Sequence, residues 1–227
     1  MKIYLNLFFL GSITTLLFPP FFFIPIGFLI IPYFFYKIIG FANQKTIKES
    51  FIEGFFYGLG LNFFLFFWLK NPFLIDQETK NLFFLSYLFV FYASIFYGLL
   101  VVFVRYFKNE KIQIIIFPAI FVLLEIIRSK LFIGFPWNLF GYIFSNYSHL
   151  FQISKYIGTY GLSYLVLVVF LVPFQILNII NKKEIKFNIY YLSITIFFLV
   201  GIYTYSFINQ ENKNSDQVYN IDIIIYQ

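Results

Sequence analysis

The chain has 227 residues, of which 61% are hydrophobic and only 11% are charged. Soluble domains carry about 25% charged residues, so this composition excludes a water-soluble globular protein and predicts a helical protein embedded in a membrane. The absence of cysteine and the single histidine, His149, exclude disulfides, thiolate metal sites, a thiol nucleophile and a multi-histidine metal centre, and we expect no cofactor.

Apolar runs recur along the whole sequence and predict an all-α polytopic membrane protein with a transmembrane domain over residues 1–208. We expect seven spans, at about 3–18, 21–39, 51–69, 82–104, 112–128, 157–180 and 188–208. Lys2 before the first run leaves a signal peptide as an alternative, but Pro19-Pro20 makes a poor cleavage site and favours an uncleaved anchor. Since proline cannot continue a helix, this pair predicts a tight turn between the first two spans.

Small and polar residues mark the third span. Gly54 and Gly58 lie one helical turn apart, and Gly60 follows closely. Small residues at this spacing let another helix approach in a membrane, so packing is the favoured interpretation and a ligand groove is the alternative. Asn62, near the end of the same span, can hydrogen-bond to a neighbouring helix.

The basic residues predict the orientation of the chain. With the N-terminus inside, the inner segments hold ten basic and four acidic residues, whereas the outer segments hold six of each. Cytoplasmic loops carry an excess of Lys and Arg, so we expect a cytoplasmic N-terminus and, after seven spans, a C-terminus on the opposite side. The net charge of +6 is thereby explained by topology, and no nucleic-acid partner is expected.

The longest outer loop, residues 129–156, is rich in aromatic residues and suits a segment lying in the headgroup layer. It contains Gly134-Phe135-Pro136-Trp137, which is interpreted either as a turn with a tryptophan anchor or as part of a functional surface. A second glycine pair, Gly158 and Gly161, begins the sixth span and is interpreted as packing.

Two ionisable residues precede this loop. Glu125 and Arg128 are three residues apart and therefore lie on one helix face. An ionisable residue in or near lipid is costly and is a functional candidate by default. The alternative is a mutual ion pair at the membrane boundary, with Arg128 extending outward to water.

The C-terminal part differs from the rest. Residues 209–219 form a polar linker, and the β-branched run within 220–227 predicts the first strand of a buried sheet. The sequence therefore looks like seven spans followed by the opening strand of a further domain on the outer side.

Four passages together resemble the N-terminal membrane part of apolipoprotein N-acyltransferases. They are Phe18-Pro19-Pro20-Phe21; Gly54 to Gly60 running on to Trp68; Pro118 through Glu125 and Arg128 to Gly134-Phe135-Pro136-Trp137-Asn138-Leu139-Phe140-Gly141-Tyr142; and Gln152 followed by Gly158-Thr159-Tyr160-Gly161-Leu162-Ser163. The third and fourth are specific at this separation, and the likeness covers essentially the whole chain.

The resemblance implies a bacterial inner-membrane protein that carries a nitrilase-like αββα domain on the periplasmic side. In that family a Glu, a Lys and a Cys of the nitrilase-like domain transfer an acyl chain from a phospholipid to the N-terminal diacylglyceryl-cysteine of an apolipoprotein. No catalytic residue maps onto this sequence, because these three would lie beyond Gln227. The implied lipid-positioning candidates are Glu125, Arg128, Gly134, Phe135, Pro136 and Trp137.

The expected partners are therefore a phospholipid acyl donor, an apolipoprotein acceptor, the bilayer and possibly a separately encoded catalytic domain. A chain without a thiol should not transfer acyl groups alone. We interpret it as a fragment, one half of a split gene, or a non-catalytic scaffold or lipid-binding relic of the family. An unrelated transporter would show charges facing a pathway and an internal repeat, and the sequence shows neither.

Overall fold

The structure, a computed structural model, describes residues 2–40, 45–131 and 136–213, and all elements in these ranges are helical. The α-helices are α1 (Lys2–Thr14), α2 (Gly27–Gly40), α3 (Ile47–Leu65), α4 (Asn71–Ile75), α5 (Leu85–Tyr106), α6 (Glu110–Lys130), α7 (Ser148–Phe151), α8 (Ser154–Phe170), α9 (Val172–Ile180) and α10 (Ile185–Lys213). Short 3-10 helices are η1 (Thr15–Leu17), η2 (Ile24–Ile26), η3 (Phe67–Lys70), η4 (Lys80–Leu82) and η5 (Phe140–Phe144).

Several helices are long and apolar enough to cross a membrane, which confirms the all-α, multi-span class. In the described part of the chain four qualify by length and composition: Lys80–Tyr106, Glu110–Lys130, Ser154–Ile180 and Ile185–Tyr205. A fifth is added if Ile47–Leu65 and Phe67–Ile75, bent by 58° to each other, count as one span. The first two predicted spans fall on shorter apolar helices, Lys2–Leu17 and Ile24–Ile39, so the count of seven stays a prediction.

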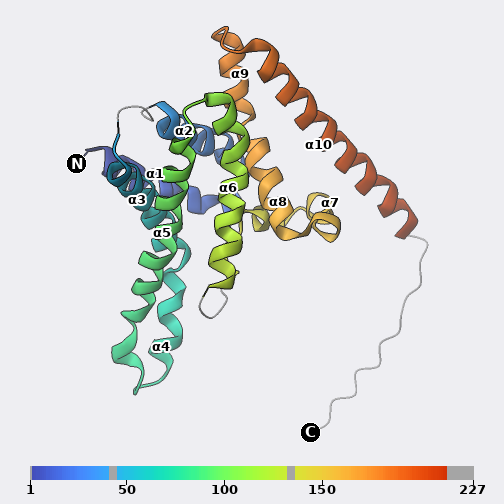
Figure 1. Cartoon of the computed structure of the whole chain (residues 1–227). Helices are drawn as coiled ribbons and strands as arrows, with labels where there is room; N and C mark the ends of the chain where they lie inside the picture. Colours follow the sequence, from blue (N-terminus) through green and yellow to red (C-terminus); the bar gives the residue numbers. More distant parts are fainter. Residues whose placement is uncertain (1, 41–44, 132–135, 214–227) are drawn as a thin grey trace.

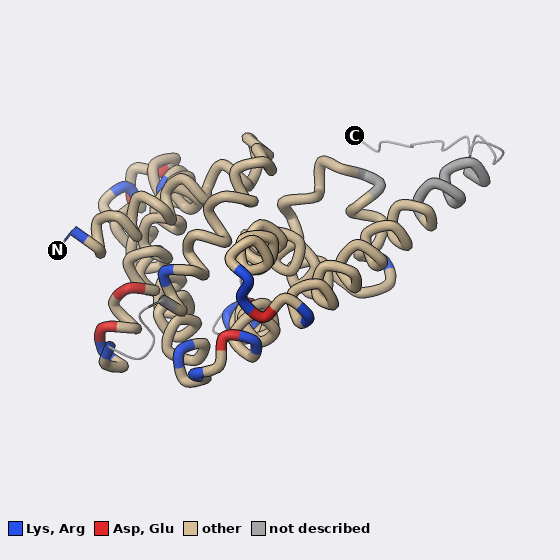
Figure 2. The backbone as a smooth tube through the Cα atoms, turned by 90° about the horizontal axis from the view of Figure 1, so that it is seen from above, with Lys and Arg blue, Asp and Glu red and all other residues tan. Residues whose placement is uncertain are grey.

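The bundle has two distinct ends (Figure 1). The α5–α6 and α9–α10 connections lie at one end, which we call the lysine end because it carries Lys108, Lys111, Lys182 and Lys183. The bend at α4 and the end of α6 lie at the other, which we call the loop end. Seen from above, charged residues gather at helix termini and connections, and long stretches of helix carry none (Figure 2).

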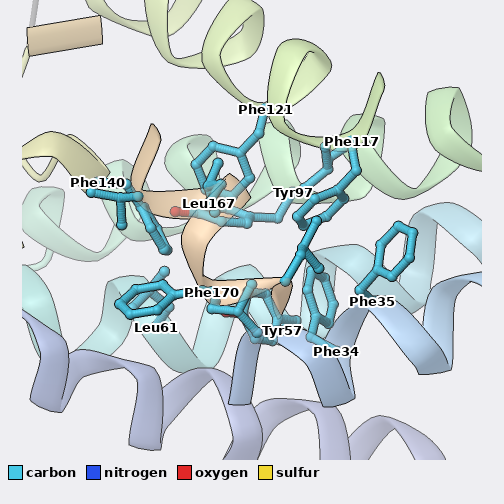
Figure 3. Packing of buried hydrophobic residues seen from close by; sticks show 14 of the residues in the cluster. Phe34, Phe35, Tyr57, Leu61, Tyr97, Phe117, Phe121, Phe140, Leu167 and Phe170 are labelled. Carbon is cyan, nitrogen blue, oxygen red and sulfur yellow. The ribbon is translucent and has the colours of Figure 1, made fainter. Parts of the chain in front are cut away.

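Buried aromatic rings fill the centre of the bundle (Figure 3). Phe34 of α2 stacks on Tyr57 of α3 with ring centroids 3.7 Å apart, and Phe117 of α6 packs edge-on against Phe35 at 5.2 Å. All four side chains are 1% exposed or less. Offset and edge-to-face pairs of this kind add about 0.5–1.5 kcal/mol each to the effect of burial.

The glycines of α3 are packing positions, as predicted. A Cβ on Gly54 would lie 2.1 Å from the carbonyl oxygen of Tyr97 in α5, and one on Gly60 would lie 1.9 Å from that of Phe8 in α1. Helix α3 therefore touches a neighbour backbone-to-backbone on two sides. The predicted interhelical bond of Asn62 is also present, because its amide donates to the Ser94 hydroxyl of α5 at 3.3 Å.

Prolines and the C-terminal segment modify the predicted spans. Pro19 and Pro20 form the expected turn, and their peptide bond is cis. The predicted span 157–180 falls within the candidate span Ser154–Ile180, in which α8 ends at Phe170 and α9 begins at Val172 with Pro173 in its first turn. Helix α10 continues to Lys213 and so includes the start of the predicted linker 209–219, whereas the predicted strand 220–227 lies outside the described residues.

A buried ion pair joins three helices near the lysine end. From the sequence, its two residues were predicted only to lie on the cytoplasmic side of the membrane. Arg105 of α5 donates to Glu53 of α3 at 2.6 Å, and both side chains are 5% exposed. The same guanidinium donates to the Ser50 hydroxyl of α3 at 2.9 Å and to the Ile38 carbonyl of α2 at 2.8 Å. Lys45 also contacts the Glu53 carboxylate. The pair is thus part of the packing of the bundle.

Candidate functional site

A pocket of about 390 Å³ lies at the loop end of the bundle. Its lining residues come from the turn after η1, the bend after α3 and the segment after α6: Phe18, Pro19, Leu65, Trp68, Pro136, Trp137, Asn138, Tyr142 and Ser145. The rings of Trp68 and Trp137 lie 5.0 Å apart at 37° to each other and join the second and third of these segments. We call this the tryptophan pocket.

Glu125 supports the segment that forms one wall of the tryptophan pocket. It lies near the end of α6, and its side chain is buried, with 5% exposed. One carboxylate oxygen accepts a hydrogen bond from the backbone N–H of Phe140 at 2.8 Å. A buried N–H left without a partner costs about 1–3 kcal/mol, so this contact fixes where the chain turns into η5.

Arg128 holds the same segment at a second point. Its guanidinium donates to the backbone carbonyl of Trp137 at 2.9 Å, and the residue is only 3% exposed. The ion pairs of the described residues do not include one between Arg128 and Glu125. The alternative of a mutual ion pair with Arg128 extending to water is therefore wrong, because both side chains turn inward to the loop backbone.

Aromatic packing fixes the pocket wall from behind. Phe140 is fully buried and packs edge-on against Phe18 at 5.3 Å and against Phe121 of α6 at 4.6 Å. The next residue, Gly141, donates its N–H to the Ser163 hydroxyl of α8 at 2.8 Å. A Cβ on Gly141 would lie 2.4 Å from the carbonyl oxygen of Thr159, so only glycine permits this approach to α8.

The first glycine of the predicted packing pair at the sixth span has a different role. Gly158 has φ +70°, a left-handed conformation that favours glycine, and a Cβ there would meet nothing within 4 Å. It kinks the start of α8, so its conformation and not its packing requires glycine. Nearby, the Tyr160 hydroxyl donates to Ser129 at 2.5 Å and ties α8 to the end of α6.

The structure therefore brings four of the six predicted positioning residues together. Pro136 and Trp137 line the pocket, and Glu125 and Arg128 hydrogen-bond to the backbone of the segment that forms one wall, whereas Gly134 and Phe135 lie outside the described residues. Sequence reasoning did not name the other seven lining residues as site candidates: Phe18, Pro19, Leu65, Trp68, Asn138, Tyr142 and Ser145. Their only signal was that all of them except Ser145 stand in passages that carry the family resemblance.

The side chains that line the tryptophan pocket suit the binding of a ligand better than covalent catalysis. Aromatic rings and proline form most of the wall. The polar side-chain groups of the lining residues are the two indole N–H groups, the amide of Asn138 and the hydroxyls of Tyr142 and Ser145. No carboxylate or histidine lines the pocket, and the described residues hold no group of three His, Cys, Asp or Glu side chains that could bind a metal. Pockets of about 300–1,000 Å³ with few polar groups bind amphipathic small molecules.

Comparison with known proteins places these segments in one family. The family model described as the apolipoprotein N-acyltransferase N-terminal domain matches residues 10–172, which include every residue that lines the tryptophan pocket. The chain belongs to the apolipoprotein N-acyltransferase family.

Curated relatives agree with this assignment. Apolipoprotein N-acyltransferases of Rickettsia prowazekii and Rickettsia bellii are 33% and 31% identical over 170 and 169 residues, which cover 70% of this chain. That of Wigglesworthia glossinidia brevipalpis is 30% identical over 178 residues, or 74% of the chain. The matches cover 32–34% of these relatives, so the chain spans about a third of the length of the apolipoprotein N-acyltransferases it matches.

The support of the pocket wall by Glu125 leads to a testable expectation. In Glu125→Ala the Phe140 N–H loses its acceptor, so hydrogen exchange at that amide should accelerate by on the order of tenfold or more. Glu125→Gln is the matched control, because its amide oxygen can still accept this bond. Mass-spectrometric exchange of the peptide containing Phe140 measures the effect, and equal exchange in both variants would contradict the role assigned to Glu125.

Proposed function

We propose that this chain is the membrane-embedded domain of an apolipoprotein N-acyltransferase and that its tryptophan pocket positions acyl-bearing substrates for transfer. The acyl group would move from a phospholipid to the N-terminal diacylglyceryl-cysteine of a lipoprotein. The covalent chemistry would belong to the further residues that the longer relatives possess. The residues of this chain bind and orient and do not react, since it has no cysteine to carry an acyl thioester.

One observation carries this proposal. Three passages that resemble the family lie far apart in the sequence, and each contributes side chains to the same pocket: Phe18 and Pro19, then Trp68, then Pro136 to Tyr142. The fourth passage supports it from behind through Ser163. Residues from separate passages that resemble the family line one pocket. This arrangement favours binding of a ligand common to the family, and not helix packing alone, as the reason for the resemblance.

The finer features of the topology belong to the same proposal. We propose seven spans in the bacterial inner membrane, with the two shorter helices Lys2–Leu17 and Ile24–Ile39 counted among them. The lysine end would face the cytoplasm, because cytoplasmic connections carry the excess of basic residues. The tryptophan pocket would then face the periplasm, where lipoprotein N-termini are exposed, and Trp68 and Trp137 would lie at headgroup depth.

A chimera tests the proposal. Residues 1–213 of this chain would replace the part of the Rickettsia prowazekii relative that contains the matched segment, in cells depleted of their own apolipoprotein N-acyltransferase. We expect the chimera to restore growth and N-acylated lipoproteins, detected by mass spectrometry of a lipoprotein N-terminus. Trp68→Ala with Trp137→Ala should reduce acylation about tenfold, the equivalent of a lost aromatic pair.

Tyr106→Ala is the matched control, because Tyr106 is an aromatic residue at 81% exposure that does not line the pocket. A chimera that inserts at normal levels but acylates nothing would overturn the proposal. That result would favour the second candidate, a membrane scaffold that binds lipid without serving acyl transfer.

A further inference from the structure

Helix α10 stands apart from the rest of the bundle. Its apolar segment Ile185–Tyr205 qualifies as a span, yet only 11% of its most apolar stretch is buried, against 50% for the other three qualifying helices. Figure 1 shows it diverging from α8 after the turn that follows α9. A wedge-shaped space therefore opens between α8 and α10.

Two adjacent cavities lie in this wedge. One of about 350 Å³ lies between the middle of α8 and the first half of α10, and one of about 330 Å³ lies between the start of α8 and the second half of α10. Both are lined by Phe198 and Ile202. The two cavities are therefore adjacent, and we call them together the α8–α10 groove.

The groove is apolar and has a defined end. The Thr195 hydroxyl donates to the carbonyl of Tyr191, and the Tyr191 hydroxyl donates to the carbonyl of Val168 at 3.5 Å, so these polar groups are already engaged. At the loop end the hydroxyls of Tyr156 and Tyr205 contact each other and tie α8 to α10. The groove is therefore suited to a hydrocarbon ligand with its polar part at the Tyr156–Tyr205 contact.

The two ends of the groove distinguish between a helix and a lipid tail as the occupant. Helix α9 and the turn after it join α8 to α10 at the lysine end, and the contacting hydroxyls of Tyr156 and Tyr205 join them at the loop end. A membrane-crossing helix about 10 Å across cannot lie between two helices that are joined at both ends. A single acyl chain is much thinner and can enter from the open side.

Charge at the loop end of the groove points to the headgroup. Lys155 precedes the groove residue Tyr156, and its ammonium lies 5.9 Å from the centre of the Tyr156 ring. Lys155 is exposed, so it can reach an anionic group at the membrane surface. We propose that the α8–α10 groove binds one acyl chain of a phospholipid, with the lipid phosphate beside Lys155. This requires only that α8 and α10 lie in a bilayer, not that the chain serves acyl transfer.

A larger side chain at position 201 is expected to block the groove. Gly201 lines the groove, and a Cβ there would meet nothing within 4 Å, so a larger side chain fits without disturbing the fold. The full chain, in vesicles of phosphatidylethanolamine and phosphatidylglycerol, would be photolabelled by phosphatidylglycerol with a diazirine in one acyl chain. We expect label on α8 and α10, and an about tenfold loss in Gly201→Phe, the equivalent of two displaced methylenes.

Val200→Phe is the matched control, because Val200 is a neighbouring exposed residue of α10 that does not line the groove. It should keep the wild-type labelling, and Lys155→Gln should lower labelling by the anionic probe. Equal labelling of the exposed face of α5, or labelling that Gly201→Phe leaves unchanged, would overturn the proposal. So would protein–protein crosslinks that place a second copy of the chain in the groove.

Discussion

Arg105→Met is expected to destabilise the bundle by about 3 kcal/mol, the lower end of the range for a broken buried pair, because the Glu53 carboxylate loses Arg105 but keeps its contact with Lys45. The variant also removes the donor to Ser50 of α3 and to the Ile38 carbonyl of α2, so three helices lose a shared contact. Thermal denaturation of the detergent-solubilised chain, followed by the fraction that remains monodisperse, measures the effect.

The double variant Arg105→Met with Glu53→Gln tests the electrostatic explanation. Replacing both members of a buried pair costs less than removing one, and the charge that then stays is that of Lys45, whose side chain is 18% exposed and therefore partly hydrated. The double variant should therefore be more stable than Arg105→Met alone, although the bond to the Ile38 carbonyl stays lost. A double variant less stable than the single one would show that the loss is explained by packing and not by the carboxylate that no longer has Arg105 beside it.

Gly60→Val is expected to separate α3 from α1 and to destabilise the fold by about 3 kcal/mol. A Cβ at this position would lie 1.9 Å from the Phe8 carbonyl oxygen, which is part of a helix backbone and cannot rotate away. The same contact is made from the other side, where a Cβ on Gly11 would lie 1.9 Å from the Tyr57 carbonyl oxygen. Relief therefore requires a shift of one whole helix against the other.

Gly201→Val is the control for this second variant, because a Cβ there would meet nothing within 4 Å. Both substitutions place the same β-branched residue in an apolar helix, so a difference between them isolates the close approach of α1 and α3. The midpoint of thermal denaturation should fall for Gly60→Val and stay near wild type for Gly201→Val. Equal midpoints would contradict the packing role of Gly60.

The helical class and most helix positions could be predicted, because apolar runs and prolines determine where helices form and where they end in the nearby sequence. The third span is an example: its glycine spacing predicted close packing, and the structure shows that packing on two sides. The number of spans is harder to predict, since a helix such as Ile24–Ile39 is apolar but shorter than the span criterion. Composition does not decide whether such a helix crosses a bilayer.

The partners of polar residues could not be predicted from spacing. Glu125 and Arg128 share a helix face, which suggested an ion pair, yet each contacts the backbone of the segment that follows α6. Glu53 and Arg105 stand 52 positions apart and form the buried pair that the sequence did not indicate. In both cases the tertiary fold, and not the spacing of residues along one helix, determines which group a polar side chain contacts.

Single-cysteine labelling is the most direct test of the proposal that the tryptophan pocket faces the periplasm and the lysine end faces the cytoplasm. The chain has no cysteine, so each introduced thiol is unique. Ser145→Cys lies in the pocket and Lys183→Cys lies in the α9–α10 connection. We predict that a membrane-impermeant maleimide added to intact spheroplasts labels Ser145→Cys, and labels Lys183→Cys only after lysis. Labelling of both from the same side, or of Lys183→Cys alone, would contradict this placement.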